Sequence, residues 1–185
     1  MSPAPGPLDT AFDRRYECEA AELPPDGRRQ FLIPPAGGGH ELAVRFEAPG
    51  TEAWVGVFAG GEMNGRSGLH TTPDPEVACV VAEGEGWLVR PAEPGWYERV
   101  RCTPVLHVLP VPARGLLVFG SHTDLVAYSA AGIAWTTERL AYSEFEVTEV
   151  GRDSLTGVTE DVPARQSVTF TVDLATGASS GGPFG

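Results

Sequence analysis

The sequence predicts an all-β protein of about a dozen short antiparallel strands joined as meanders, with little helix. Residues 125–135 (LVAYSAAGIAW) and 170–179 (FTVDLATGAS) each have the pattern of a strand, a tight turn with glycine and a second strand. The two segments recur after about 40 residues, which indicates repeated meander units. No apolar pattern with the helical period extends beyond two turns. We therefore expect a β-sandwich or a small propeller-like or barrel arrangement.

The first half of the chain predicts an N-terminal arm followed by strands. Residues 1–29 are expected to form a partly ordered arm, and residues 30–185 a single all-β domain. Within the arm, residues 12–21 are compatible with a short helix, although its apolar face is thin. Residues 40–47 (HELAVRFE) alternate in polarity like a half-buried strand, and residues 77–82 (VACVVA) are continuously apolar like a central one. The strands expected here are residues 30–33, 40–47, 53–58 and 77–82.

The second half predicts a denser series of strands. Residues 104–112 (PVLHVLPVP) contain three prolines, which prevent full ladder pairing, so this segment is expected at a sheet edge. The glycine-rich tail, residues 177–185, is expected to be frayed. The remaining strands are expected at residues 87–90, 96–102, 116–120, 125–128, 133–137, 145–150, 154–158 and 167–174.

Two segments also align with each other, residues 86–100 (GWLVRPAEPGWYERV) and residues 124–140 (DLVAYSAAGIAWTTERL), with Trp96 placed over Trp135. They resemble the repeats of pyrroloquinoline-quinone-type β-propellers, in which a strand and an aspartate- or glycine-containing turn precede an aromatic residue. Three or four such units are too few for a propeller of six to eight blades. A sandwich or an incomplete propeller-like barrel is therefore the preferred architecture.

The composition restricts the partners of the protein. The 185 residues carry a formal net charge of −12, which repels nucleic-acid phosphate and anionic lipid and attracts a basic protein or a cationic ligand. We expect no nucleic-acid or membrane partner, while the oligomeric state is left open. The N-terminus lacks the apolar stretch of a signal peptide, so the expected location is cytoplasmic.

All 13 basic residues are arginine, and there is no lysine. This usage is typical of a GC-rich bacterial genome, and it excludes Schiff-base chemistry and a phosphate-loop lysine. The three cysteines, Cys18, Cys79 and Cys102, are odd in number and widely spaced, so neither a disulfide framework nor a metal site is expected.

The longest predicted loop, residues 59–76, is the first candidate binding site. Loops beyond about 12–15 residues without secondary structure are uncommon and tend to be functional or disordered, so a mobile surface loop is the alternative. Residues 60–67 (GGEMNGRS) approach a phosphate-loop pattern, but Arg66 replaces its lysine and prolines follow where a helix is required. The candidate binding residues of this loop are Glu62, Asn64, Arg66, Ser67, His70 and Asp74.

Trp135 and Arg139 are the remaining candidate binding residues. They are separated by four positions, so an unbroken strand would place them on one face, where an arginine beside an aromatic ring can hold a carboxylate. The alternatives are a tryptophan in the core and an arginine paired with a neighbouring glutamate. His107, His122 and Asp124 could meet across a hairpin as metal ligands, but we expect solvent-facing histidines and no metal or cofactor.

No motif in the sequence indicates a particular enzymatic reaction. The favoured interpretation is a non-enzymatic bacterial binding module, similar in charge and size to immunity or inhibitor proteins that neutralise basic toxins. One alternative is a small-molecule-binding protein or enzyme with a tryptophan-lined pocket closed by residues 59–76. Another is a β domain that assembles with copies of itself through exposed sheet edges.

Overall fold

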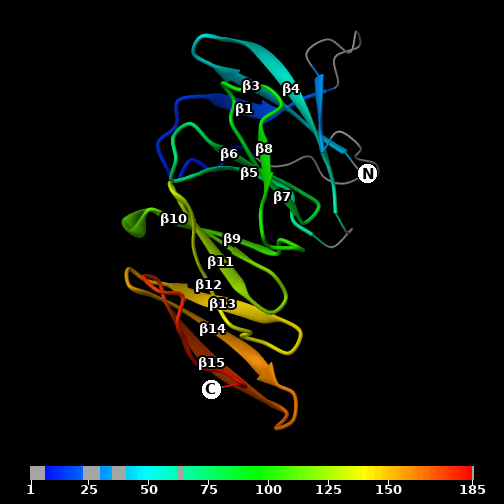
Figure 1. Cartoon of the computed structure of the whole chain (residues 1–185). Helices are drawn as coiled ribbons and strands as arrows, with labels where there is room; N and C mark the ends of the chain where they lie inside the picture. The colour runs from blue at the N-terminus through cyan, green and yellow to red at the C-terminus, as the bar shows by residue number, and fades with distance from the viewer. Residues whose placement is uncertain (1–6, 23–29, 35–40, 62–64, 185) are drawn as a thin grey trace. The chain divides into compact units, whose positions relative to one another are not determined.

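The computed structural model describes residues 7–22, 30–34, 41–61 and 65–184. It confirms the all-β class, with 54% of these described residues in strands and 2% in helix. Their sixteen strands form four sheets of four strands each, and none of these sheets closes into a barrel. The chain divides into two compact units, Met1–Val105 (unit 1) and Leu106–Gly185 (unit 2) (Figure 1).

The first sheet of unit 1 has the order β1-β3-β4-β2. Its centre is the hairpin of β3 (Glu41–Ala48) and β4 (Thr51–Ala59), in which the predicted alternation buries Val44 and Phe46 on one face. On the outer sides, β1 (Glu17–Ala20) pairs antiparallel with β3, and β2 (Gln30–Ile33) pairs parallel with β4. The sheet is therefore mixed, with partners drawn from distant parts of the sequence.

The second sheet of unit 1 is a meander. It runs in chain order through β5 (Gly68–Thr71), β6 (Ala78–Ala82), β7 (Glu85–Val89) and β8 (Tyr97–Arg99). Every residue of β6 is buried, as its continuously apolar sequence predicts. Buried side chains of both sheets form one core, and the Trp54 Nε1–H donates to the Pro91 carbonyl at 2.8 Å. The core includes Val44, Phe46, Trp54, Phe58, Ala78, Val80 and Trp87.

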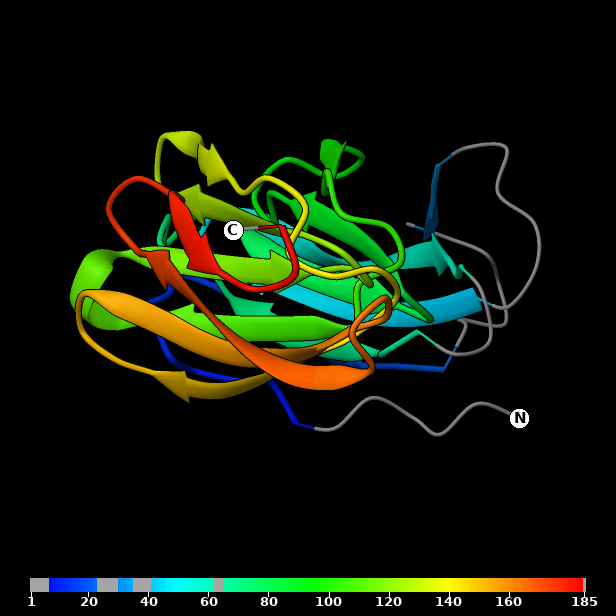
Figure 2. The same cartoon turned by 90° about the horizontal axis from the view of Figure 1, so that it is seen from below.

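Unit 2 consists of two further meanders, drawn from green to red in Figure 2. Buried side chains of both meanders form one core. The first contains β9 (His107–Val111), β10 (Leu116–Gly120), β11 (Leu125–Ser129) and β12 (Gly132–Thr136), with the short 3-10 turn η1 (Pro112–Arg114) after β9. The second contains β13 (Phe145–Val150), β14 (Ser154–Asp161), β15 (Gln166–Asp173) and β16 (Ser179–Gly181). The core includes Val118, Leu125, Trp135, Phe145, Leu155 and Phe170.

The structure confirms the predicted repetition of meanders. Three successive four-stranded meanders begin at β5, β9 and β13, about 40 residues apart. The segments aligned through Trp96 and Trp135 contain the third and fourth strands of the first and second meanders. The hairpins at residues 125–135 and 170–179 lie in the third and fourth strands of the second and third. The segment expected at a sheet edge, residues 104–112, contains β9 with Pro110, and β9 is an edge strand of its sheet.

Three segments differ from their predicted structure. Instead of a helix, residues 17–20 form β1, because Tyr16 and Cys18 alternate into the core. Part of the predicted loop, residues 68–71, forms β5, which buries Leu69 and Thr71. The tail expected to be frayed contributes β16, which pairs with β15. In each case, pairing with a neighbouring strand stabilises a segment whose own sequence is too short or too glycine-rich to predict a strand.

The N-terminal segment attaches to the edge of β5. The Asp9 N–H donates to the Leu69 carbonyl at 2.9 Å, and the Thr71 N–H donates to the Asp9 carbonyl at 2.9 Å. The Phe12 N–H donates to Thr71 Oγ1 at the same distance. This segment therefore acts as a partial extra strand beside β5. The structure describes two compact units. The predicted division into an N-terminal arm and a single domain stays a prediction.

Candidate functional site

Arg66 and Ser67 of the predicted binding loop are hydrogen-bonded to the turn between β6 and β7. Glu62 and Asn64 lie outside the described residues. The Arg66 carbonyl accepts the Gly84 N–H at 2.8 Å, and Ser67 Oγ accepts the Glu83 N–H at 2.9 Å. The Ser67 hydroxyl is thus part of the scaffold that holds the loop on the turn.

His70 and Asp74 lie in and after β5. The His70 side chain is 17% exposed, its Nδ1 lies 3.4 Å from Asp9 Oδ2, and burial lowers the pKa of its imidazole. Asp74 Oδ1 accepts the Glu76 N–H at 3.0 Å, and its Oδ2 lies 3.9 Å from an Arg90 Nη2. Because Ser67 and Asp74 flank opposite ends of β5, the described candidates of this loop do not converge on one point.

Trp135 and Arg139 belong to unit 2. Trp135 is buried in the core, where its Nε1–H donates to the Leu174 carbonyl at 2.9 Å. Arg139 donates from Nε to the Ala141 carbonyl at 2.8 Å and from Nη2 to the Tyr142 carbonyl at 2.7 Å. The arginine therefore organises the connection from β12 to β13. A ligand-binding role for this pair stays a prediction.

No protein-family model matches this chain, and no curated protein matches it either. No helix among the described residues is long and apolar enough to cross a membrane. Within the same residues, no group of three or more histidine, cysteine or acidic side chains has an arrangement that could hold a metal ion. The surfaces of the two units therefore indicate what each unit can bind.

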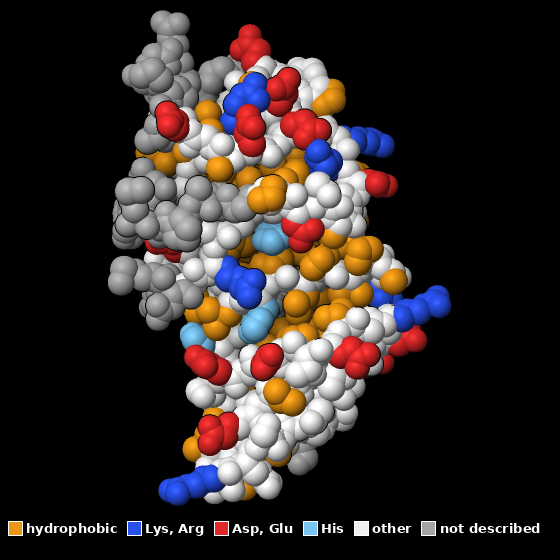
Figure 3. Space-filling view, turned by 180° about the vertical axis from the view of Figure 1, so that it is seen from behind, with side chains coloured by type: hydrophobic (Ala, Val, Ile, Leu, Met, Phe, Trp, Pro, Cys, Tyr) orange, Lys and Arg blue, Asp and Glu red, His pale blue; other side chains and the backbone are white. Residues whose placement is uncertain are grey.

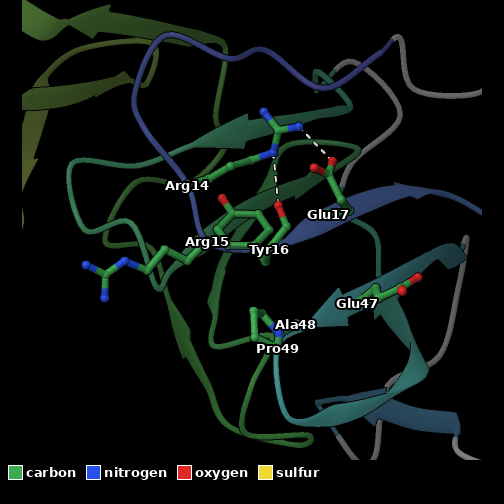
Figure 4. Close-up of a pocket in the computed structure, with 7 residues that line it drawn as sticks. All are labelled: Arg14, Arg15, Tyr16, Glu17, Glu47, Ala48 and Pro49. Atoms are coloured by element: carbon green, nitrogen blue, oxygen red, sulfur yellow. Dashed lines mark hydrogen bonds and ion pairs between the residues drawn. The ribbon is translucent and has the colours of Figure 1, made fainter.

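Unit 1 has an open depression of about 520 Å³ between the start of β1 and the β3–β4 turn (Figure 4). The volume is comparable to that of small-molecule sites, which generally enclose about 300–1,000 Å³. The lining residues are Arg14, Arg15, Tyr16, Glu17, Glu47, Ala48 and Pro49.

The charges around this depression are paired. An Arg14 Nη2 lies 2.6 Å from Glu17 Oε2, and this hydrogen bond raises the pKa of the Arg14 guanidinium. Arg15 extends away from Arg14 in Figure 4, and its Nη1 lies 3.0 Å from Glu76 Oε1. The Tyr16 hydroxyl donates to a buried backbone carbonyl, and burial raises its pKa. Each arginine already has a carboxylate partner, so the depression offers little excess charge to an ionic ligand.

Unit 2 has a smaller depression of about 280 Å³ over β13, β14 and β15. Glu144 is 80% exposed, and its Oε1 lies 4.0 Å from His122 Nδ1. The Glu144 carbonyl accepts the Thr159 hydroxyl at 2.7 Å, which fixes the backbone at the start of β13. The lining residues are Glu144, Phe145, Glu146, Val158, Thr159 and Ser167.

The sheet that bears this depression differs from the other three in charge. The strands of the β9–β12 sheet contain no Asp, Glu or Arg. In unit 1, each sheet contains one arginine beside its glutamates: Arg45 lies near Glu19 and Glu47, and Arg99 pairs with Glu85. The β1–β4 sheet is nevertheless acidic, since its strands hold five glutamates. The strands of the β13–β16 sheet contain acidic residues and no arginine: Glu146, Glu149, Glu160, Asp161 and Asp173.

This acidic sheet face was not among the predicted sites. Figure 3 shows one face of the molecule, on which acidic side chains are interspersed with arginines. Residues 143–150 (SEFEVTEV) carried the missing signal, because they contain three glutamates and no basic residue. The predicted strands at residues 154–158 and 167–174 also contain no arginine, but the sequence pattern alone does not show that they pair beside these glutamates.

Proposed function

We propose that this chain is a non-enzymatic binding module that recognises a basic protein partner through the β13–β16 sheet. The observation that carries the proposal is the charge of that sheet, whose strands hold five carboxylates and no arginine. The arginines of this region lie in or beside its turns: Arg152 and Arg165 are turn residues, and Arg114 pairs with Asp153. The glutamates of β13 therefore form the part of the face without an arginine partner among the described residues. The depression lined by Glu144 and Glu146 gives the acidic face a concave contact surface. A bacterial, cytoplasmic protein of the immunity or inhibitor type fits this description.

The electrostatic effect of such a face falls mainly on association. Exposed carboxylates contribute little to affinity individually, since water and salt screen them. Together they create a potential that steers a basic protein toward the sheet and raises its association rate about 10- to 1,000-fold at low salt. The partner is therefore expected to bind with a rate that falls steeply as ionic strength rises.

The candidate residues of types that often act in catalysis, Ser67 and His70, have contacts typical of structural residues. Ser67 Oγ accepts a backbone N–H, and His70 is largely buried beside Asp9. The alternative of a tryptophan-lined pocket stays a prediction, and neither of the two depressions described above is lined by a tryptophan. Trp54, Trp87 and Trp135 each donate their Nε1–H to a backbone carbonyl.

A binding assay with defined proteins tests the proposal. Immobilised chain is exposed to cytochrome c as the basic probe and to an acidic protein of similar size, at about 20 and 200 mM salt. The triple variant Glu144→Gln, Glu146→Gln and Glu149→Gln is expected to lower the association rate of cytochrome c about five- to tenfold at low salt.

A matched variant separates a specific surface from general charge. Glu22→Gln, Glu93→Gln and Glu98→Gln remove the same charge from exposed positions in unit 1. These changes are expected to reduce the rate less than twofold, because they lie outside the proposed surface. Equal effects of the two triple variants, or no binding of cytochrome c at low salt, would overturn the proposal.

A further inference from the structure

The outer edge of β13 is open. β13 stands at one end of the sheet order β13-β14-β15-β16, and no strand among the described residues pairs with its other side. Its side chains from Glu146 to Val150 are exposed, except Val147, which is half-buried. An open edge presents backbone N–H and carbonyl groups that can pair with another strand.

The other sheet edges of unit 2 differ from β13 in ways that matter for pairing. β9 contains Pro110, which has no N–H to donate. β16 has only three residues, and β12 (GIAWT) has no charged side chain. The β13 edge is thus the longest edge without proline in this unit, and it carries charge.

The charge of β13 selects the kind of strand that fits beside it. Glu146 and Glu149 flank a bulge between Val147 and Glu149, and Glu144 precedes the strand. Pairing with a second copy of β13 would bring glutamates together, and like charges on neighbouring strands are destabilising. A strand with arginine or lysine at alternate positions would instead place each cation beside a carboxylate.

The glutamates in and before β13 have few ion-pair partners among the described residues. Within the described residues, the ion-pair contact of Glu144 is with His122 at 4.0 Å, and His122 is charged only when protonated. Neither Glu146 nor Glu149 lies within ion-pair distance of an arginine in that part of the chain. The bulge restricts a regular ladder to the part of the edge before Thr148.

We propose that an extended basic segment of the partner adds as a fifth strand to the free edge of β13, with its cations directed to Glu144 and Glu146. This inference rests on the proposed function and specifies its binding mode. Backbone hydrogen bonds to the edge supply register, and the depression beside Glu146 receives one basic side chain of the added strand.

Synthetic peptides test strand addition separately from charge attraction. The probe is a six-residue peptide alternating arginine and threonine, with blocked ends, measured against the full chain by fluorescence anisotropy. Two further peptides carry N-methyl groups on alternate backbone amides, one on the odd and one on the even positions. N-methylation keeps every charge but removes the hydrogen-bond donors of one peptide edge.

The expected result is that one methylated peptide binds at least tenfold more weakly than the parent while the other is less affected. The parent peptide should also slow hydrogen exchange of amides in residues 145–147. Equal binding of all three peptides, without added exchange protection, would overturn strand addition. In that case the Glu144, Glu146 and Glu149 triple variant would still bind cytochrome c about five- to tenfold more slowly at low salt if the proposed function is correct.

Discussion

The tryptophan in β12 offers the most direct test of how unit 2 is held together. Trp135 lies in the first sheet of unit 2, and its Nε1–H donates to the Leu174 carbonyl, which follows β15 of the second. Both residues are buried, at 7% and 1% exposure. Replacing Trp135 with phenylalanine removes this link and shortens the ring that contacts Gly177.

The cost follows from these contacts. A buried carbonyl left without a donor costs about 1–3 kcal/mol. The smaller ring leaves a cavity of roughly 40 Å³, which adds about 1 kcal/mol if the surroundings do not collapse. We therefore expect Trp135→Phe to lower the free energy of unfolding by about 2–4 kcal/mol.

Urea unfolding followed by far-UV circular dichroism measures this change at constant pH. The matched control is Trp96→Phe, since Trp96 is half-buried and has the guanidinium of Arg90 at 4.9 Å from its ring centre. That change should cost less than about 1 kcal/mol. A cost below about 1 kcal/mol for Trp135→Phe, or equal costs for the two variants, would show that the inter-sheet hydrogen bond is not a major support of unit 2.

Three further predictions concern packing, pH and thiols. Gly157→Ala should lower the free energy of unfolding by about 1–3 kcal/mol, because its added Cβ would overlap the Phe170 ring. The control Gly151→Ala should be nearly neutral. Equal free energies of unfolding for the two variants in urea would contradict this prediction. Since burial lowers the pKa of His70, the unfolded chain binds its proton more readily, so stability should decrease as pH falls below about 6.5. His70→Gln should flatten that decrease between about pH 6.5 and 5, and an unchanged slope argues against the buried imidazole as its source. All three thiols are buried, and burial raises the pKa of Cys18 to about 12, so a thiol reagent should label them only after unfolding; rapid labelling of the native protein would contradict it.

Local features of the sequence predicted most of the strands. Alternation in residues 40–47 and the continuous apolar run in residues 77–82 correspond to β3 and β6, because side chains on successive strand positions face opposite sides. Turn glycines located the hairpins, since a turn needs backbone conformations that glycine adopts at low cost. The meander repetition followed from the spacing of these hairpins.

The strands that the sequence does not predict depend on their pairing partners. β5 contains glycine and threonine and has no strong strand pattern, but it pairs with the next strand, β6, and with the distant residue Asp9. The loop interpretation of residues 59–76 places the candidate binding residues in and around this strand. Its pairing gives His70 and Ser67 structural partners that no sequence pattern indicates.

Short segments of the sequence specify the all-β class, the meander repetition and the acidic character of the protein, because alternation, turn residues and charge are local properties. The mixed sheet of unit 1 is different, since β1 pairs with β3 and β2 pairs in parallel with β4 across intervening residues. Folding also leaves the outer edge of β13 without a paired strand among the described residues. Pairing between residues far apart in the sequence, and the lack of it at an edge, are not encoded by local composition.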